Sequence, residues 1–274
     1  MIGQWFHGSA CLLLGLCLAA SEALAEQTCQ QLTATGNPEY PPYLWRDPQD
    51  PQRLIGVNAD LLRHVGQSLG LEVQVVYAGP WSRAQEEVRT GHIDLLAGYF
   101  VTQARQQSMD FISPPFLYTP SVVWVRRDGA FDYGKWSDLE GRKGGTLVNN
   151  SHGQAFDEYA RANLDLEAVP SARQAFEKLL LKRSDYVVYE QFPGMALAGQ
   201  LNMDEQLKVL APAVSSEGLY LAFSRASPCN QPQLRERLAQ KMKQVVSGQL
   251  PQRLLERNLQ RWKQQQQQPA AQAP

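Results

Sequence analysis

The chain has 274 residues, 43% of them apolar, and a formal net charge of −1 at pH 7. This length is enough to bury one large core or two medium ones. Because the charge is balanced and Lys and Arg form no run, the composition excludes a broad nucleic-acid-binding surface, and we expect no nucleic-acid partner.

Residues 1–25 are predicted to be an export signal that is cleaved. Cys11–Ala20 is an apolar core of signal-peptide length, too short to span a bilayer, and Ala23–Ala25 supplies a small-x-small cleavage site. The segment before this core lacks Lys and Arg, so an uncleaved anchor is the alternative. Leu16 precedes Cys17 where a lipoprotein signal has a small residue, which disfavours lipid attachment. Nothing later in the sequence is apolar for a membrane-spanning length.

Cleavage would leave two of the four cysteines, Cys29 and Cys229. An even pair of cysteines in an oxidising compartment suggests a disulfide. The alternative is two unpaired thiols, which would be unusual in an exported protein.

Strands and helices alternate in the first third of the chain. The predicted elements are a strand at Gln31–Thr35, a loop at 36–43, a helix at Asp60–Leu69, a strand at Leu71–Val75 and a helix at Ser82–Thr90. An aromatic loop stiffened by prolines can stack on a ligand at little entropic cost, which makes Tyr40 a candidate site residue; the alternative is a Pro-rich surface loop. Trp81 is expected to be a core residue rather than a pocket wall.

The stretch from Gly91 to Phe116 organises the rest of the sequence. It contains a buried strand through Leu95 and Leu96, a loop at the carboxyl end of that strand, and Arg105 within the loop. In an open α/β sheet, ligands sit in the crevice beyond the carboxyl ends of the strands. Arg105 is therefore placed to present its planar fork to a carboxylate, although a lone arginine is also common as a solvated surface residue.

The second half of the chain repeats this alternation. The predicted elements are strands at Ser121–Val125 and Gly145–Val148, a helix from Ser151 as N-cap to Ala162, a helix from Ser171 to Lys182, strands at Asp185–Glu190, Leu207–Leu210 and Leu219–Ser224, and two C-terminal helices reaching Trp262. Glu190 also falls at the carboxyl end of a strand; the alternative is a surface acid on an edge strand. Residues 263–274 are predicted to be a disordered polar tail.

Six short motifs follow one another between Tyr40 and Phe116. They are Tyr40-Pro41-Pro42-Tyr43, Gly56-Val57-Asn58-Ala59-Asp60-Leu61, Pro80-Trp81-Ser82-Arg83, Gly91-His92-Ile93-Asp94, Thr102-Gln103-Ala104-Arg105 and Asp110-Phe111-Ile112-Ser113-Pro114-Pro115-Phe116. In this order they resemble the bacterial extracellular solute-binding proteins of family 3, which bind amino acids and related small polar solutes. The resemblance extends from Leu32 to Trp262.

The resemblance implies a two-lobed α/β fold of the periplasmic-binding-protein type (type II), in which each lobe is a sheet flanked by helices and two strands cross between the lobes. It places the first lobe at residues 30–122 and 218–262 and the second lobe at residues 126–212. It also places Cys29 and Cys229 on the same lobe, which favours the disulfide between them.

The resemblance also implies a site for a ligand that carries a carboxylate and an ammonium. Arg105 and the backbone amides of the helix that starts at Ser151 would bind the carboxylate. Glu190 would pair with the ammonium, and Tyr40 would cover the body of the ligand. His152 stands where relatives often have Ser or Thr; it either contacts the ligand or caps the helix.

The loop before Arg105 departs from the family pattern. It carries Gly98, Tyr99, Phe100 and Val101 where the best-known amino-acid binders have hydroxyl residues that help to hold the ammonium. Only the hydroxyl of Thr102 is left there, and the backbone at Gly98 is the substitute. The sequence therefore leaves the identity of the ligand open.

The resemblance implies a monomer without a cofactor that acts in the periplasm, binds a small molecule and is not an enzyme. Its partner would be an inner-membrane ABC permease. No metal is expected, because no second His or Cys lies at ligand spacing from His152. One alternative is a dehydratase of the same fold acting on prephenate or arogenate, with Glu39, Glu190 and His152 as acid and base groups. The other is a ligand sensor that docks on a membrane receptor.

Overall fold

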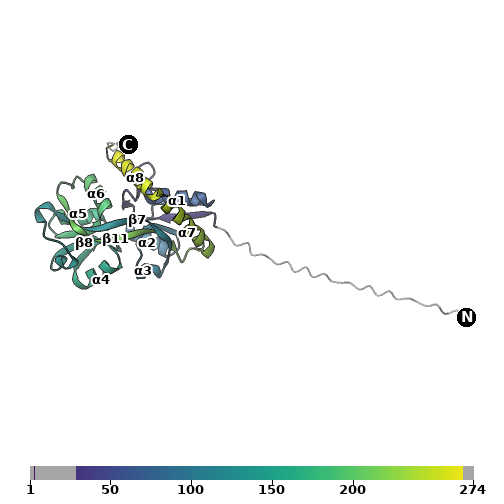
Figure 1. Cartoon of the computed structure of the whole chain (residues 1–274), viewed down its shortest axis with the longest axis horizontal. Coiled ribbons are helices and arrows are strands. Elements are labelled where there is room, and N and C mark those ends of the chain that lie inside the picture. Colours follow the sequence, from purple (N-terminus) through teal and green to yellow (C-terminus); the bar gives the residue numbers. More distant parts are fainter. Residues whose placement is uncertain (1–2, 4–28, 268–274) are drawn as a thin grey trace.

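Two lobes lie on either side of a pair of long strands, β7 (Met109–Arg126) and β11 (Leu207–Ser224) (Figure 1). The computed structural model describes residue 3 and residues 29–267. The predicted export signal therefore falls, apart from Gly3, outside the described residues. β7 and β11 pair antiparallel and pass through both lobes, so they form the connection between them.

One eight-stranded sheet runs through the molecule in the order β5-β1-β6-β11-β7-β10-β8-β9. Its remaining strands are β1 (Gln31–Thr35), β5 (Glu72–Val75), β6 (Leu95–Tyr99), β8 (Lys143–Leu147), β9 (Asp165–Val169) and β10 (Tyr186–Glu190). β1 pairs parallel with β5 and β6 in the first lobe, and β8 pairs parallel with β9 and β10 in the second. The two-lobed α/β architecture predicted from the sequence is confirmed, with the sheets of the two lobes joined into one ladder.

Helices cover both faces of the sheet in the first lobe. They are α1 (Val57–Ser68), α7 (Pro232–Ser247) and α8 (Leu250–Gln267) on one face and α2 (Trp81–Arg89) on the other. Successive side chains of a strand point to opposite faces, and β6 follows this rule. Leu95 and Ala97 pack in the cluster under α1, while Leu96 packs in the cluster under α2. Both faces of β6 are thus buried.

The second lobe is built in the same way. Its helices are α5 (Ala172–Leu180) and α6 (Gln191–Gln200) on one face and α4 (Gln154–Asn163) on the other. Val187 and Tyr189 of β10 pack toward α5 and α6, whereas Tyr186 and Val188 pack in the cluster that contains Phe156 of α4. All five residues of β10 are buried, so the strand holds its last residue, Glu190, in a fixed position.

Short elements complete the fold. They are the three-stranded sheet of β2 (Glu39–Tyr40), β3 (Leu44–Arg46) and β4 (Leu54–Ile55), the one-turn helix α3 (Gln103–Gln106), and 3-10 helices at Arg127–Gly129 and Trp136–Leu139. No helix in the described ranges is both long and apolar enough to cross a membrane.

The disulfide between Cys29 and Cys229 is present, with 5.6 Å between the Cα atoms. It ties the residue that precedes the first strands to the segment just before α7, within the first lobe. The pairing that the resemblance favoured is thus confirmed.

The last helix extends further than the sequence predicted. Residues 263–267 continue α8, so assigning them to a disordered tail was wrong, and residues 268–274 lie outside the described residues. Trp262 packs edge-on against Trp45 at 5.5 Å between ring centroids. The indole Nε1 of Trp45 donates a 2.9 Å hydrogen bond to Oε1 of Gln265. These contacts hold the last turn of α8 against the β2–β3 segment.

Candidate functional site

The carboxyl ends of parallel strands from both lobes meet at a small cavity. Asn37 follows β1, Tyr99 ends β6, Asn150 follows β8 and Glu190 ends β10. This is the crevice beyond the strand ends that open α/β sheets use for ligands. The cavity measures about 20 Å³, which is room for about one water molecule. It is lined by Asn37, Tyr40, Trp81, Gly98, Tyr99, Phe100, Arg105, Asn150, Glu190 and Leu219.

The first lobe contributes Arg105, which α3 holds in place. The Oγ1 of Thr102 caps α3 by accepting a 3.2 Å hydrogen bond from the backbone N–H of Arg105. The guanidinium lies 3.8 Å above the ring of Tyr99, and its Nη1 donates to the carbonyl of Phe100 at 3.1 Å. Its Nη2 donates to the carbonyl of Asn149 in the second lobe at 3.2 Å. Arg105 is therefore oriented from both sides of the cleft.

The second lobe contributes Glu190, whose carboxylate is only partly satisfied. The residue is 2% exposed, and Nδ2 of Asn150 donates to its Oε1 at 3.3 Å. Its Oε2 is buried with no hydrogen-bond partner among the described residues. Burial raises the pKa of Glu190 to about 7, although its backbone N–H, Asn150 and the charge of Arg105 all lower it. A buried carboxylate oxygen without a donor is costly, so this atom is ready to accept one.

Arg105 and Glu190 thus face one cavity from opposite lobes with opposite charges. Burial lowers the pKa of Arg105, while the nearby Tyr99, Asp157 and Glu190 raise it; an arginine stays protonated in proteins in any case. Among the described residues that line the cavity, these two are the charged ones. The cavity therefore offers a donor fork and an acceptor that a small zwitterion could join.

Two more of the predicted residues line the same cavity. Tyr40, from β2, is 6% exposed and packs 5.2 Å from Tyr43 between ring centroids. Gly98 has φ 91°, and a Cβ on it would lie 2.3 Å from Nδ2 of Asn58. That approach leaves no room for a side chain, so Gly98 can contribute only backbone.

Ser151 lies next to the cavity rather than in it. Its hydroxyl donates to Oδ2 of Asp157, and Oδ1 of Asp157 accepts from the backbone N–H of His152 at 2.8 Å. The next N–H, that of Gly153, donates to Oγ of Ser151 at 3.2 Å. Two of the amides that were expected to bind a carboxylate, those of His152 and Gly153, are therefore already paired within the loop.

The start of α4 also differs from the prediction. The helix begins at Gln154 with Gly153 as N-cap at φ 98°, so the assignment of Ser151 as N-cap was wrong. Asp157, in the first turn of α4, accepts the hydrogen bonds from the hydroxyl of Ser151 and the backbone N–H of His152. Ser151 therefore does not cap the helix. Gly153 has φ 98°, a conformation that residues with a side chain rarely adopt, so glycine is favoured there.

The structure does not bring His152 to the cavity. Its ring is 3% exposed, with Nε2 2.8 Å from Oγ1 of Thr146 and Nδ1 3.2 Å from Oγ of Ser121. Burial, together with the charge of Arg105, lowers the pKa of His152 to about 3. His152 is therefore a neutral core residue that ties the loop after β8 to β7.

An open groove of about 730 Å³ adjoins the cavity between α2 and α3 of the first lobe and α4 of the second. Tyr99, Arg105 and Asn150 line both spaces, and Thr102 and Ser151 line only the groove. The backbone N–H of Gln103 donates across it to Oε1 of Gln154 at 3.1 Å. On another side, the hydroxyl of Tyr189 donates to the carbonyl of Glu39 at 3.1 Å. With the bond from Arg105 to Asn149, these contacts hold the lobes close together.

Several lining residues were not predicted as site residues. Tyr99 and Asn37 lie at strand ends, so the same rule that identified Arg105 and Glu190 would have found them. Trp81 was assigned to the core; it is 6% exposed and packs edge-on to Tyr99 at 5.7 Å, yet it also lines the cavity. Its indole Nε1 is buried without an acceptor in the described part of the chain. Trp81 and Glu190, which both line the cavity, thus carry a buried donor and a buried acceptor without partners within the portion of the chain that the structure describes.

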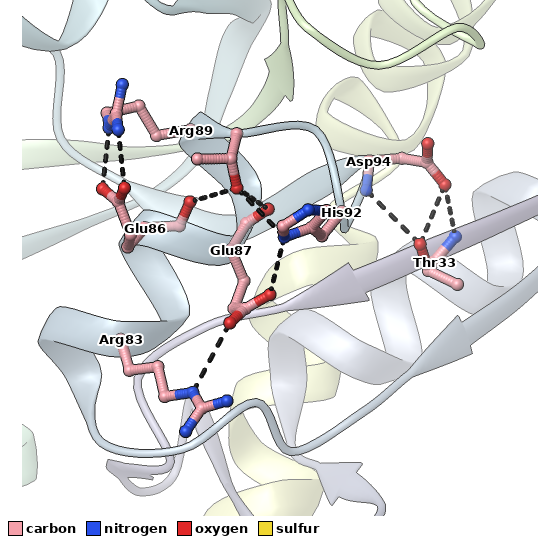
Figure 2. Close-up of polar contacts among 8 residues, drawn as sticks. Thr33, Arg83, Glu86, Glu87, Arg89, His92 and Asp94 are labelled. Carbon is pink, nitrogen blue, oxygen red and sulfur yellow. Dashed lines mark hydrogen bonds and ion pairs between the residues drawn. The ribbon is translucent and has the colours of Figure 1, made fainter.

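Other residues of the six motifs make polar contacts within the first lobe, away from the cavity, as Figure 2 shows for Arg83, His92 and Asp94. Asp94 accepts from the backbone N–H and the hydroxyl of Thr33 at 2.8 and 2.9 Å, which joins β1 to the turn before β6. Nδ1 of His92 lies 3.1 Å from Oε2 of Glu87, and Arg83 pairs with Glu87 at 3.4 Å on α2. These motif positions support the scaffold and do not line the cavity.

The acid and base groups required by the dehydratase alternative do not converge. Glu39 lines a separate space of about 260 Å³ beside Trp45 and Trp262, and His152 is buried behind the loop. Glu190 alone of the three lines the cavity. Within residues 29–267, no group of three or more His, Cys, Asp or Glu side chains could hold a metal ion.

Comparisons with known proteins agree with the two-lobed fold. The family model described as "Bacterial extracellular solute-binding proteins, family 3" matches residues 32–261. A search of curated proteins finds no match.

Solved structures share the fold at low sequence identity. A mutant of ArgBP from T. maritima is 19% identical with a TM-score of 0.70, and the match covers 84% of this chain and 96% of that one. AbpA from Streptococcus pneumoniae, bound to L-arginine, is 17% identical with a TM-score of 0.69, covering 85% and 96%. A histidine kinase sensor domain with similarity to periplasmic binding proteins is 22% identical with a TM-score of 0.70, also covering 85% and 96%. At these identities the likeness establishes the fold.

Proposed function

This chain belongs to the bacterial extracellular solute-binding proteins of family 3, and we propose that its cleft captures an amino acid or a similar small zwitterion for delivery to an ABC permease. Arg105 binds the carboxylate of the ligand and Glu190 binds its ammonium. Tyr40 and the backbone at Gly98 enclose the rest. The observation that carries this proposal is the buried Oε2 of Glu190, which lacks a donor in the described structure, in a residue that lines the same cavity as Arg105.

The binding free energy of the ligand requires contacts from both lobes. A micromolar ligand needs about 8 kcal/mol of binding free energy. A hydrogen bond to a charged group contributes about 1.5–3 kcal/mol. Arg105 alone therefore cannot hold the ligand, whereas Arg105 and Glu190 together with the aromatic walls can. Because each lobe supplies one charge, the bound ligand stabilises the closed arrangement.

The cavity as it stands is too small for an amino acid, so the lobes separate before the ligand binds. β7 and β11 are the connections that bend. Their register shifts between Leu210 and Ser215, where β11 carries extra residues against β7, and such bulges bend a strand. We place the division between the lobes close to residues 122–126 and 212–218, and we place the mature protein in the periplasm as a monomer after removal of residues 1–25.

The test is isothermal titration calorimetry of the purified protein with the common L-amino acids, followed by the variants Arg105→Lys, Arg105→Ala and Arg83→Ala. Lysine keeps the charge but loses the planar fork, so the Kd of the bound amino acid is expected to rise about tenfold or more. Arg83 is paired with Glu87 on the outer face of α2, so removing it should leave the Kd unchanged. Unchanged affinity in Arg105→Lys and Arg105→Ala would remove Arg105 from the site.

A further inference from the structure

We infer that the ligand carries one ammonium, one carboxylate and an uncharged side chain, and that Asn37 excludes ligands with a cationic side chain; this rests on the proposed function. Among the described residues that line the cavity, Glu190 is the one anion and Arg105 the one cation. A zwitterion pairs with both and leaves no charge over. An amino acid with a second cationic group would bring that group into the cavity with no anion to meet it.

An unpaired buried charge is expensive. Moving an ion from water into a protein interior costs several kcal/mol even after relaxation, which exceeds the gain from one further polar contact. The other acids nearby line the neighbouring spaces, and those in the groove already have partners. Both oxygens of Asp157 bind the 151–153 loop, Glu86 pairs with Arg89, and Glu158 accepts from Gln154. Glu39 lines the space beside Arg173. A ligand guanidinium or side-chain ammonium would thus be buried without a partner.

The two sets of lining residues also give the ligand orientation that belongs to this inference. Arg105, Tyr99 and Asn150 lie where the cavity meets the outer groove, because they line both. We orient the ligand with its carboxylate on Arg105 toward the groove. Its side chain then lies against residues that line the cavity and not the groove, among them Asn37 and Tyr40.

Asn37 is a neutral polar group among these residues. Its Oδ1 accepts the backbone N–H of Glu39 at 3.0 Å, which shapes the turn after β1. An aspartate has the same shape and can accept the same hydrogen bond, so Asn37→Asp adds an anion to the cavity lining without changing the turn. Asn37 is thus the residue at which the charge preference of the site can be reversed.

The experiment measures the Kd values of neutral L-amino acids, L-lysine and L-arginine by calorimetry, for the wild type, Asn37→Asp and Asn202→Asp. Asn202→Asp adds the same charge at an exposed turn after α6. We expect the wild type to bind a neutral amino acid at least tenfold more tightly than lysine or arginine. Asn37→Asp should improve the affinity for a cationic ligand about tenfold or more, and Asn202→Asp should change neither Kd.

The outcomes separate the inference from the proposed function. Wild-type binding of arginine or lysine as tight as that of any neutral amino acid overturns the inference and leaves the zwitterion site standing. An Asn37→Asp variant that folds, binds the neutral ligand and gains nothing for cations also overturns it. If only compounds that lack the ammonium or the carboxylate bind, both the inference and the proposed function are wrong.

Discussion

Replacing Glu190 by glutamine should make the ligand-free protein more stable while it weakens ligand binding. The pKa of Glu190 is raised from 4.5 to about 7 by burial. Each pKa unit corresponds to about 1.4 kcal/mol, so ionisation of this carboxyl destabilises the folded state by about 3 kcal/mol above pH 7. Glutamine has nearly the same shape and no charge, so Glu190→Gln should recover much of this free energy.

The stability gained in Glu190→Gln should depend on pH. The folded state binds the Glu190 proton more tightly than the unfolded state, because the folded pKa is the higher one. The contribution of Glu190 to the free energy of unfolding is therefore fully present below about pH 4.5 and is lost as the pH rises through about 7. The advantage of Glu190→Gln should be near zero at pH 4 and reach its maximum above pH 7.

The assay is thermal unfolding of the ligand-free wild type and Glu190→Gln at pH 4 and pH 8. For a chain of this size, about 3 kcal/mol corresponds to a Tm difference of about 6–12 °C. Glu236→Gln, an exposed change on α7, is the matched control and should move the Tm little at either pH. A variant that is less stable than the wild type at pH 8, or equally stabilised at both pH values, would refute the reasoning.

Three further results are expected. Because only ionised Glu190 pairs with an ammonium, the Kd of the zwitterion should rise about tenfold per pH unit below pH 6, as calorimetry between pH 5 and 8 would show; a flat profile would contradict the pairing. Trp81→Phe removes the unpaired indole donor and should raise the Kd about tenfold, and an unchanged Kd at full binding stoichiometry would show that this N–H does not reach the ligand. Changing both Cys29 and Cys229 to Ser should lower the stability by about 2–5 kcal/mol in denaturant titrations, because the bridge closes a long segment of chain; equal stability would argue against the bridge.

The position of the site could be predicted from the sequence because it follows from strand ends. Arg105 and Glu190 were found by their place after buried apolar segments, and parallel strands bring such places together. Tyr99 and Asn37 obey the same rule, but their residue types do not indicate a site, since an aromatic residue extends a strand pattern and an asparagine is typical of a turn. A charged residue at the end of a buried strand therefore indicates a site more clearly than a neutral one does.

The details that the sequence did not reveal depend on contacts between side chains. The hydroxyl of Ser151 and the backbone N–H of His152 are paired with Asp157, which the helix brings back onto the loop. The ring of His152 is buried because Thr146 and Ser121, on two different strands, lie on either side of it. A pattern of residue types along one segment contains no information about such partners.

The end of α8 also depends on a side-chain contact, with a residue far away in the sequence. A run of glutamines has little apolar character and is typical of a disordered tail. Here Gln265 accepts a hydrogen bond from Trp45, 220 positions away in sequence. The last helical turn is therefore stabilised by a neighbour that the local sequence does not indicate.

The most direct test of the site is calorimetry with a bound amino acid and its analogue lacking the amino group, on the wild type and Glu190→Gln. If a guanidinium and a carboxylate from opposite lobes hold a zwitterion, the wild type should strongly prefer the amino acid. Glu190→Gln should lose most of that preference while it binds the analogue at least as well as the wild type. Equal loss of affinity for both ligands in Glu190→Gln, or no preference in the wild type, would contradict the account.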